Sequence, residues 1–139
     1  MKIYIASSWK NQHAVELLTE KLEVYGHIVI SFVREAAENE DRNEWNYKDF
    51  TEWIWSENGA QKFKFDLDGA TKSDLLIYIS PSGTDAWAEV GAAWASGVTI
   101  YGLYAKGETA GLTRRMVTKW FKDYKTLLEE VLYFAQGVD

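Results

Sequence analysis

The stretch "DLLIYIS" at residues 74–80 decides the fold class. Five apolar residues follow one another between an aspartate and a serine. A continuous apolar run of this length is typical of a strand that is covered on both faces of a parallel sheet. The turn Pro81-Ser82-Gly83 follows at once, so the strand is expected to end there.

On both sides of this strand, short β-rich runs alternate with helical segments. Further strands are expected at residues 2–6, 27–33 and 98–104, and helices at 14–26, 48–72, 85–96 and 113–135. This order predicts an α/β fold, a small doubly wound parallel sheet of four to five strands, flavodoxin-like or Rossmann-like. The length fits a single domain over residues 1–139.

Three places carry weaker patterns. Residues 34–46 are highly charged without a clear period, which predicts a surface loop. Asn58-Gly59 is expected to break or kink the helical region around it, and Asp123 to interrupt the last helix.

Composition and charge exclude several classes of function. The net charge is −6 and no Lys/Arg-rich run exists, which argues against a nucleic-acid polymer or an anionic membrane as partner. The chain has no Cys, which excludes thiol catalysis and thiolate metal sites. Neither a signal peptide nor an apolar run of about 18 residues is visible, so a cytoplasmic protein is expected.

Glu89 is the one charged residue between Ala86 and Gly97, a run of Ala, Gly, Ser, Val and Trp. A solvated glutamate on an exposed face is the ordinary interpretation. However, the small and apolar residues around it leave little of the helix surface for solvent. Burial would raise the pKa of this carboxyl, and perturbed carboxyls concentrate at functional sites, so both interpretations stay open here.

Asp66 and Asp68 lie at the end of the preceding helix. They are either ordinary aspartates near a helix terminus, or one of them faces Glu89 from the adjacent helix. Two carboxyls about 5–5.5 Å apart suit retaining glycosyl chemistry, with one as nucleophile and the other as acid/base partner.

Ligands of open α/β sheets bind beyond the carboxyl ends of the strands. Helix N-termini there favour a phosphate, although capping explains any single serine equally well. The residues expected at this edge are Ser7, Ser8, Trp9 and Lys10 after the first strand, Arg34 and Glu35 after the second, and Pro81, Ser82, Gly83, Thr84 and Asp85 after the third.

Common cofactor and nucleophile motifs are missing from the sequence. It contains no G-x-G-x-x-G, no G-x-x-x-x-G-K-[ST] and no G-x-S-x-G. His13 and His27 lie far apart without a supporting cluster, so neither a metal nor a cofactor is expected.

Three blocks resemble the nucleoside 2-deoxyribosyltransferase family, including its small phage-type and nucleotide N-glycosidase relatives. They are "KIYIASSW", "FDLDGATKSDLLIYI" and "PSGTDAWAEVGAAWASGVTIYGL", which cover less than half of the chain in the family's order. The second block places Asp66 eight residues before Asp74, as the family does.

The resemblance implies an enzyme that cleaves the N-glycosidic bond of a nucleoside or its 5′-monophosphate. Glu89 matches the nucleophile that attacks C1′, Asp66 the carboxyl that protonates the departing base, and Tyr4 the tyrosine that orients the nucleophile. Ser82 and Gly83 match the turn that contacts the sugar or a 5′-phosphate. Ser7, Ser8, Trp9 and Lys10 are the other expected substrate contacts.

The family is usually dimeric or larger, and an interface through Trp87 and Trp94 is as compatible with the sequence as core packing. Trp45, Trp53 and Trp55 would form either a lid that stacks on a base or a packed insertion, and their alternation with charged residues favours the lid.

The turn before Glu89 departs from the family, whose nucleoside enzymes place an aspartate there. Alternatives to the enzyme are a non-catalytic nucleotide-binding or signalling domain on the same fold and a structural oligomeric domain.

Overall fold

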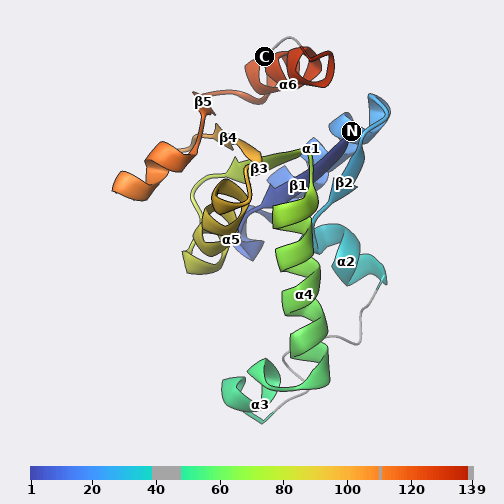
Figure 1. The fold of residues 1–139 in the computed structure, drawn as a ribbon, viewed down its shortest axis with the longest axis vertical. Coiled ribbons are helices and arrows are strands. Elements are labelled where there is room, and N and C mark those ends of the chain that lie inside the picture. The colour runs from blue at the N-terminus through green and yellow to red at the C-terminus, as the bar shows by residue number, and fades with distance from the viewer. Residues whose placement is uncertain (39–47, 110, 138–139) are drawn as a thin grey trace.

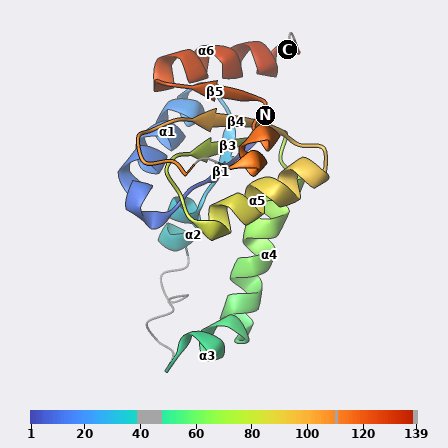
Figure 2. The same ribbon diagram turned by 90° about the vertical axis from the view of Figure 1, so that its left-hand side faces the viewer.

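A computed structural model describes residues 1–38, 48–109 and 111–137 (Figure 1 and Figure 2). Its elements, in chain order, are β1 (Lys2–Ala6), the 3₁₀ helix η1 (Trp9–Asn11), α1 (Gln12–Val24), β2 (Ile28–Ile30), α2 (Phe32–Glu38), α3 (Phe50–Ile54), α4 (Glu57–Lys72), β3 (Leu75–Ile79), α5 (Thr84–Ala95), β4 (Thr99–Leu103), the 3₁₀ helix η3 (Leu112–Met116), β5 (Lys119–Phe121) and α6 (Tyr124–Ala135).

The strands form one parallel sheet of five strands in the order β2-β1-β3-β4-β5. The predicted fold class, an α/β doubly wound parallel sheet, is therefore confirmed. The chain runs outward from β1 in both directions, so the strand order reverses between β1 and β3. In folds of this kind the reversal opens a crevice at the carboxyl ends of those two strands.

Two apolar cores cover the two faces of the sheet, because successive side chains of a strand point to opposite sides. Ile3 and Ile5 of β1 belong to the core under α1 and α6. Tyr4 and Ala6 belong to the core under α4 and α5. In β3 all five residues are buried, as the sequence predicted. Tyr4 thus points from the middle of the sheet toward α4 and α5.

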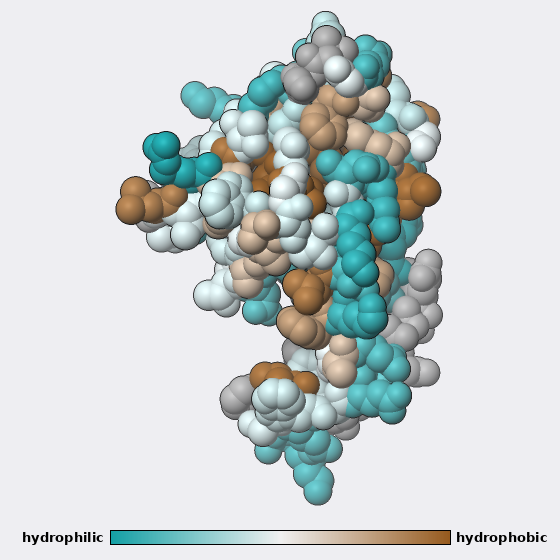
Figure 3. Space-filling view, in the orientation of Figure 1, coloured by the Kyte–Doolittle hydropathy of each residue, from teal (hydrophilic) through white to brown (hydrophobic). Residues whose placement is uncertain are grey.

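Helix α4 extends away from the sheet and carries α3 at its far end (Figure 1 and Figure 2). Hydrophilic side chains run along α4 in Figure 3, and Lys64 and Lys72 each pair with Asp68 on this helix. In the segments that the structure describes, no helix has the length and apolarity needed to cross a membrane.

The expected loop at residues 34–46 is wrong at its start, because α2 occupies Phe32–Glu38. The expected strand at 27–33 is correspondingly short, covering Ile28–Ile30. Phe32 is 8% exposed, and its burial anchors a helix where the apolar run resembled a continuing strand. Residues 39–47 of the expected loop lie outside the described residues.

The expected helix over 113–135 is wrong in its first half. That segment forms η3 and then β5, whose Lys119 lies opposite Tyr101 of β4. Three residues of strand are too short to show a period, and their pairing with β4 decides their conformation. Asp123 does mark a boundary, because its side chain accepts a hydrogen bond from the Thr126 amide and caps α6.

The break near Asn58-Gly59 falls slightly earlier than expected, between α3 and α4. Ser56 caps α4 by accepting a hydrogen bond from the Gly59 amide. A Cβ on Gly59 would lie 2.2 Å from the Trp53 carbonyl oxygen, so glycine is required where the two helices meet.

Gly69 allows α4 to lie directly on β1. A Cβ at this position would come within 2.4 Å of Cδ1 of Tyr4. Gly91 on α5 offers a contrast, since its Cβ would meet only Cε of Met116 at 3.9 Å.

We expect Gly69→Ala to lower the free energy of unfolding by about 1–3 kcal/mol, because a buried ring or helix must shift to admit the methyl group. Gly91→Ala should be neutral or raise it by up to ~1 kcal/mol, because alanine favours the helix. Urea denaturation of both variants measures the difference. Equal effects at the two glycines would contradict the close contact between α4 and Tyr4.

Candidate active site

The hydroxyl group of Tyr4 contacts two carboxyl groups. It donates a hydrogen bond of 2.8 Å to Oε1 of Glu89 and lies 3.4 Å from Oδ1 of Asp66. Tyr4 itself is 2% exposed. The three side chains named by the sequence resemblance therefore meet at one point, although β1, α4 and α5 carry them and Glu89 is 85 residues from Tyr4.

Local structure explains this convergence. Tyr4 points toward α4 and α5 because strand alternation places it on that face. Asp66 lies one turn before Gly69, where α4 touches the Tyr4 ring. On α5, the fully buried Val90 and Ala93 pack against the sheet and place Glu89 beside this contact. Small residues thus bring both helices close enough for one hydroxyl to reach both carboxyls.

A cavity of about 320 Å³ opens onto these groups. This volume lies within the range of small-molecule sites. The cavity is lined by Tyr4, Ser7, Ser8, Trp9, Phe32, Lys62, Asp66, Gly83, Thr84, Asp85, Ala86 and Glu89. Its walls come from α4 and from the segments that follow β1, β2 and β3, and these strand ends form the edge predicted from the fold.

The electrostatics of the site favour protonated carboxyls. Burial, together with the negative charge of Asp66, raises the pKa of Glu89 to about 8. Burial also raises the pKa of Asp66, and Lys62 partly opposes this shift. The pKa of Tyr4 lies far above its ordinary value because the ring is buried beside two acids. Two acids this close titrate as a coupled pair, so one proton is shared between them near neutral pH.

The loops after β1 and β3 are tied together by hydrogen bonds. The Ser82 hydroxyl donates to the Ile79 carbonyl and accepts from the Ser8 amide, at 2.8 and 3.0 Å. Asn11 donates to the Pro81 carbonyl at 2.7 Å. Ser82 therefore holds the loops in place instead of lining the cavity. Lys10 is exposed and is also absent from the lining, whereas the other four predicted contacts, Ser7, Ser8, Trp9 and Gly83, line it.

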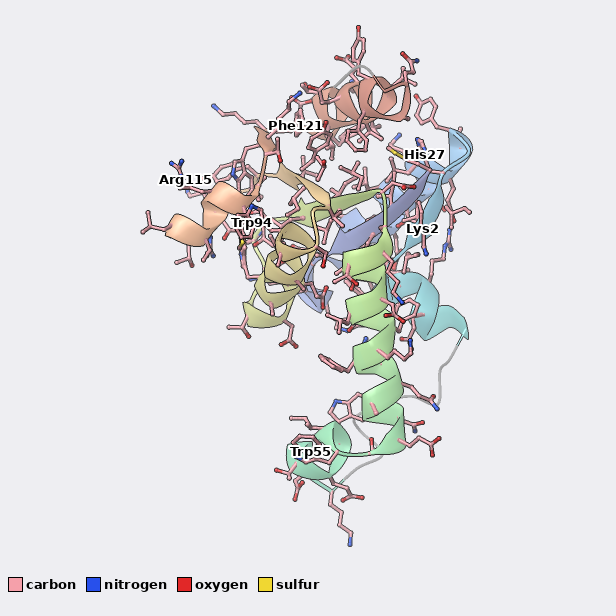
Figure 4. All side chains as sticks on the ribbon, viewed as in Figure 1. Lys2, His27, Trp55, Trp94, Arg115 and Phe121 are labelled. Atoms are coloured by element: carbon pink, nitrogen blue, oxygen red, sulfur yellow. The ribbon has the colours of Figure 1, made fainter. Side chains whose placement is uncertain are left out.

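The tryptophans expected to form a lid do not reach the cavity where the structure describes them. Trp45 lies outside the described residues. Neither Trp53 nor Trp55 belongs to the lining. Trp55 is 84% exposed at the far end of the molecule from α6 (Figure 4). Trp9 provides an aromatic wall instead, with its ring centroid 4.2 Å from that of Phe32.

The two tryptophans of α5 have different surroundings. Trp94 is 60% exposed. Trp87 is covered by the Arg114 guanidinium, 4.0 Å from its ring centroid, and its indole N–H donates to Glu108. Trp87 therefore packs against residues of its own chain. Of the two tryptophans expected at an interface, Trp94 is the one that is exposed.

Sequence reasoning missed several cavity residues, of which Lys62 and Phe32 are the most informative. Lys62 precedes Asp66 by four residues, so helical spacing was a signal that could have placed them together. No comparable signal existed for Phe32, because its segment resembled a strand.

Several solved structures share this fold, including an N-glycosidase and a deoxyribosyltransferase. Clostridium botulinum CMP N-glycosidase has a TM-score of 0.60 and 23% identity, covering 94% of this chain and 98% of that chain. The 2-deoxyribosyltransferase from Bacillus psychrosaccharolyticus has a TM-score of 0.65 and 24% identity, covering 91% of this chain and 90% of that chain. Both are named for reactions of the family that the three sequence blocks resemble. At this identity the likeness establishes the fold. No protein-family model matches the chain, and no curated protein matches it either.

The raised pKa of Glu89 predicts a pH-dependent cost to stability. Its folded-state pKa of about 8 lies above the ordinary value of 4.5, so the folded state binds the proton more tightly and wild-type stability falls as pH rises between these values. Glu89→Gln removes this loss. We expect its stability relative to wild type to increase by roughly 1–3 kcal/mol between about pH 5 and about pH 9.

Urea midpoints at the two pH values provide the measurement. Asp68→Asn is the control, because hydrogen bonding to Lys64 keeps the pKa of this accessible carboxyl below its ordinary value. Its effect should not change over that range. A constant difference between Glu89→Gln and wild type would show that Glu89 is not desolvated.

Proposed function

We propose that this chain is a nucleoside 2-deoxyribosyltransferase-like enzyme. It cleaves the N-glycosidic bond of a nucleoside or its 5′-monophosphate and passes the sugar, by way of a covalent bond to Glu89, to another base or to water. The observation that carries the proposal is the pair of carboxyl groups joined by the Tyr4 hydroxyl at the wall of a cavity.

The two carboxyls have complementary tasks in this reaction. Glu89, ionised, attacks C1′ as the bond to the base breaks, and a sugar ester forms. Asp66, protonated, gives its proton to the departing base. In the second half, Asp66 takes a proton from water or from an incoming base, which attacks C1′ and releases Glu89.

The reaction requires an ionised Glu89 and a protonated Asp66. A single proton shared by the two acids is enough, provided that it resides on Asp66 when the reaction begins. A pKa of about 8 means that Glu89 holds the proton most of the time in the empty site near neutral pH. The Tyr4 hydroxyl can accept a proton from one acid while it donates its own to the other, because it lies near both. Its hydrogen bond to Glu89 also stabilises the ionised form of the nucleophile.

The cavity walls suit the rest of a nucleoside. Trp9 and Phe32 offer an aromatic surface for the base. The N-terminus of α5 at Gly83 offers backbone N–H groups to sugar hydroxyls or to a 5′-phosphate, and Ser7 and Ser8 line the wall beside it.

The two structural neighbours support this choice of reaction, since one is a CMP N-glycosidase and the other a 2-deoxyribosyltransferase.

We also propose a cytoplasmic homodimer or larger assembly that uses the exposed Trp94.

A panel of ribo- and deoxyribonucleosides and their 5′-monophosphates tests the activity, with free base measured by chromatography. We expect base release by the wild type, none by Glu89→Ala, and a loss of about 100-fold or more in kcat with Asp66→Asn. Asp68→Asn, on the same helix but outside the cavity, should keep full activity. Binding without release by the wild type would favour a nucleotide-binding domain instead.

A trapped intermediate tests the role of Glu89 as a nucleophile. A 2′-fluoro analogue of the best substrate destabilises the oxocarbenium-like state and should leave the sugar attached to the protein. Peptide mass spectrometry should find the adduct on Glu89 in the wild type and nowhere in Glu89→Ala. Base release without an adduct would show that Glu89 activates water directly, and the transferase step would be abandoned.

A further inference from the structure

Lys62 is enclosed between two acids. Its Nζ lies 3.6 Å from Oδ2 of Asp66, one turn along α4, and 4.0 Å from Oε2 of Glu35 on α2. The Lys62 side chain is 27% exposed and that of Glu35 is 5% exposed. Of the described residues that line the cavity, Lys62 is the one cation.

A second pair on the same helix shows what is unusual here. Lys64 and Asp68 have the same spacing, but their side chains are 73% and 37% exposed. Water screens a pair of that kind, and it contributes little. Lys62 instead pairs with Asp66 on its own helix and with Glu35 of α2. Its charge also opposes the rise in the pKa of Glu89 on α5, and the acidic Tyr4 hydroxyl and Asp85 line the same cavity. An ion pair in such a place acts in a lower dielectric and is stronger.

The proposed reaction moves a negative charge toward Lys62. Before the first step, Glu89 is ionised and Asp66 carries the proton. The C1′–N bond then breaks and the C1′–O bond to Glu89 forms, while the proton leaves Asp66 and forms an N–H bond on the base. The charge lost by Glu89 therefore appears on Asp66, beside the ammonium group.

We propose that Lys62, held in place by Glu35, is a positioning residue that stabilises the Asp66 carboxylate as Asp66 protonates the departing base; this role rests on the proposed function. An interaction that strengthens as charge develops lowers the barrier and not merely the substrate's dissociation constant. Glu35 keeps the long lysine side chain from turning out to solvent.

The pKa of Asp66 responds to both partners in opposite senses. Burial raises it most, Lys62 lowers it, and the negative charge of Glu35 raises it again. Removal of the lysine charge should therefore raise the pKa of Asp66 further. Removal of the Glu35 charge should lower it. A role limited to packing would not produce opposite shifts.

The test compares Lys62→Met, Lys62→Arg and Glu35→Gln with the control Lys64→Met. The carboxyl carbon of Asp66, followed by NMR over a pH titration without substrate, gives its pKa. We expect an upward shift in Lys62→Met, a downward shift in Glu35→Gln, and no change in Lys64→Met. If Lys62→Met does not fold, Lys62→Gln replaces it in the comparison, because it also removes the positive charge and keeps a long polar side chain.

Base release from the best substrate of the panel gives the second readout. We expect kcat to fall roughly ten- to a hundredfold in Lys62→Met with a smaller change in KM, and Lys62→Arg to restore most of it. Two results would overturn this inference alone. One is an active wild type together with an unchanged kcat in Lys62→Met, and the other is an Asp66 pKa that does not change in Lys62→Met. A wild type that releases no base from any substrate overturns the proposed function as well.

Discussion

The site depends on the contacts of the Tyr4 hydroxyl group with two carboxyl groups. This hydroxyl is the point where β1, α4 and α5 meet, and it bonds to Glu89 at 2.8 Å while it lies near Asp66. Two acids that share a desolvated space repel each other once both are ionised, so the site keeps a proton there. The fold supplies the geometry through close helix packing, above all where Gly69 meets the Tyr4 ring.

This arrangement lowers stability, and in the proposed reaction it raises reactivity. Burial of Glu89 raises its pKa to about 8, which costs folding free energy whenever the group is ionised. The same burial makes an ionised carboxylate more reactive toward an electron-poor carbon, because few water molecules solvate it. Active sites commonly carry such local costs, and the two apolar cores of this sheet provide the stability that offsets them.

A second polar cluster, centred on Glu108, contacts α5 through Trp87 and lies outside the cavity. It takes no part in the proposed chemistry. Glu108 accepts hydrogen bonds from Trp87, Tyr78 and Arg114, and its side chain is 6% exposed. Burial alone would raise its pKa, but these donors outweigh burial and hold the pKa below its ordinary value. Tyr78 in turn accepts the Ser82 amide. The cluster thus fixes the turn from which α5 starts, and with it the position of Glu89.

The sequence by itself determined the parallel sheet and named the three side chains that meet beside the cavity. The apolar run 74–80 predicts a fully buried strand, and the strand ends predict the edge where the cavity lies. Tyr4, Asp66 and Glu89 were identified because each lies in a block that resembles one family. Glu89 was also conspicuous as the single charge on a helix of small residues.

Only the tertiary structure decided the rest. The three residues of β5 became a strand because β4 pairs with them, and Phe32 began a helix because its ring is buried. Lys62 and Glu35 are charged residues of the kind found on any protein surface, and it is the fold that brings their charged groups within 4.0 Å and leaves Glu35 5% exposed. Local patterns record propensity and periodicity. They do not show which charged side chains a neighbouring element will shield from water, and that shielding sets the electrostatics of this cavity.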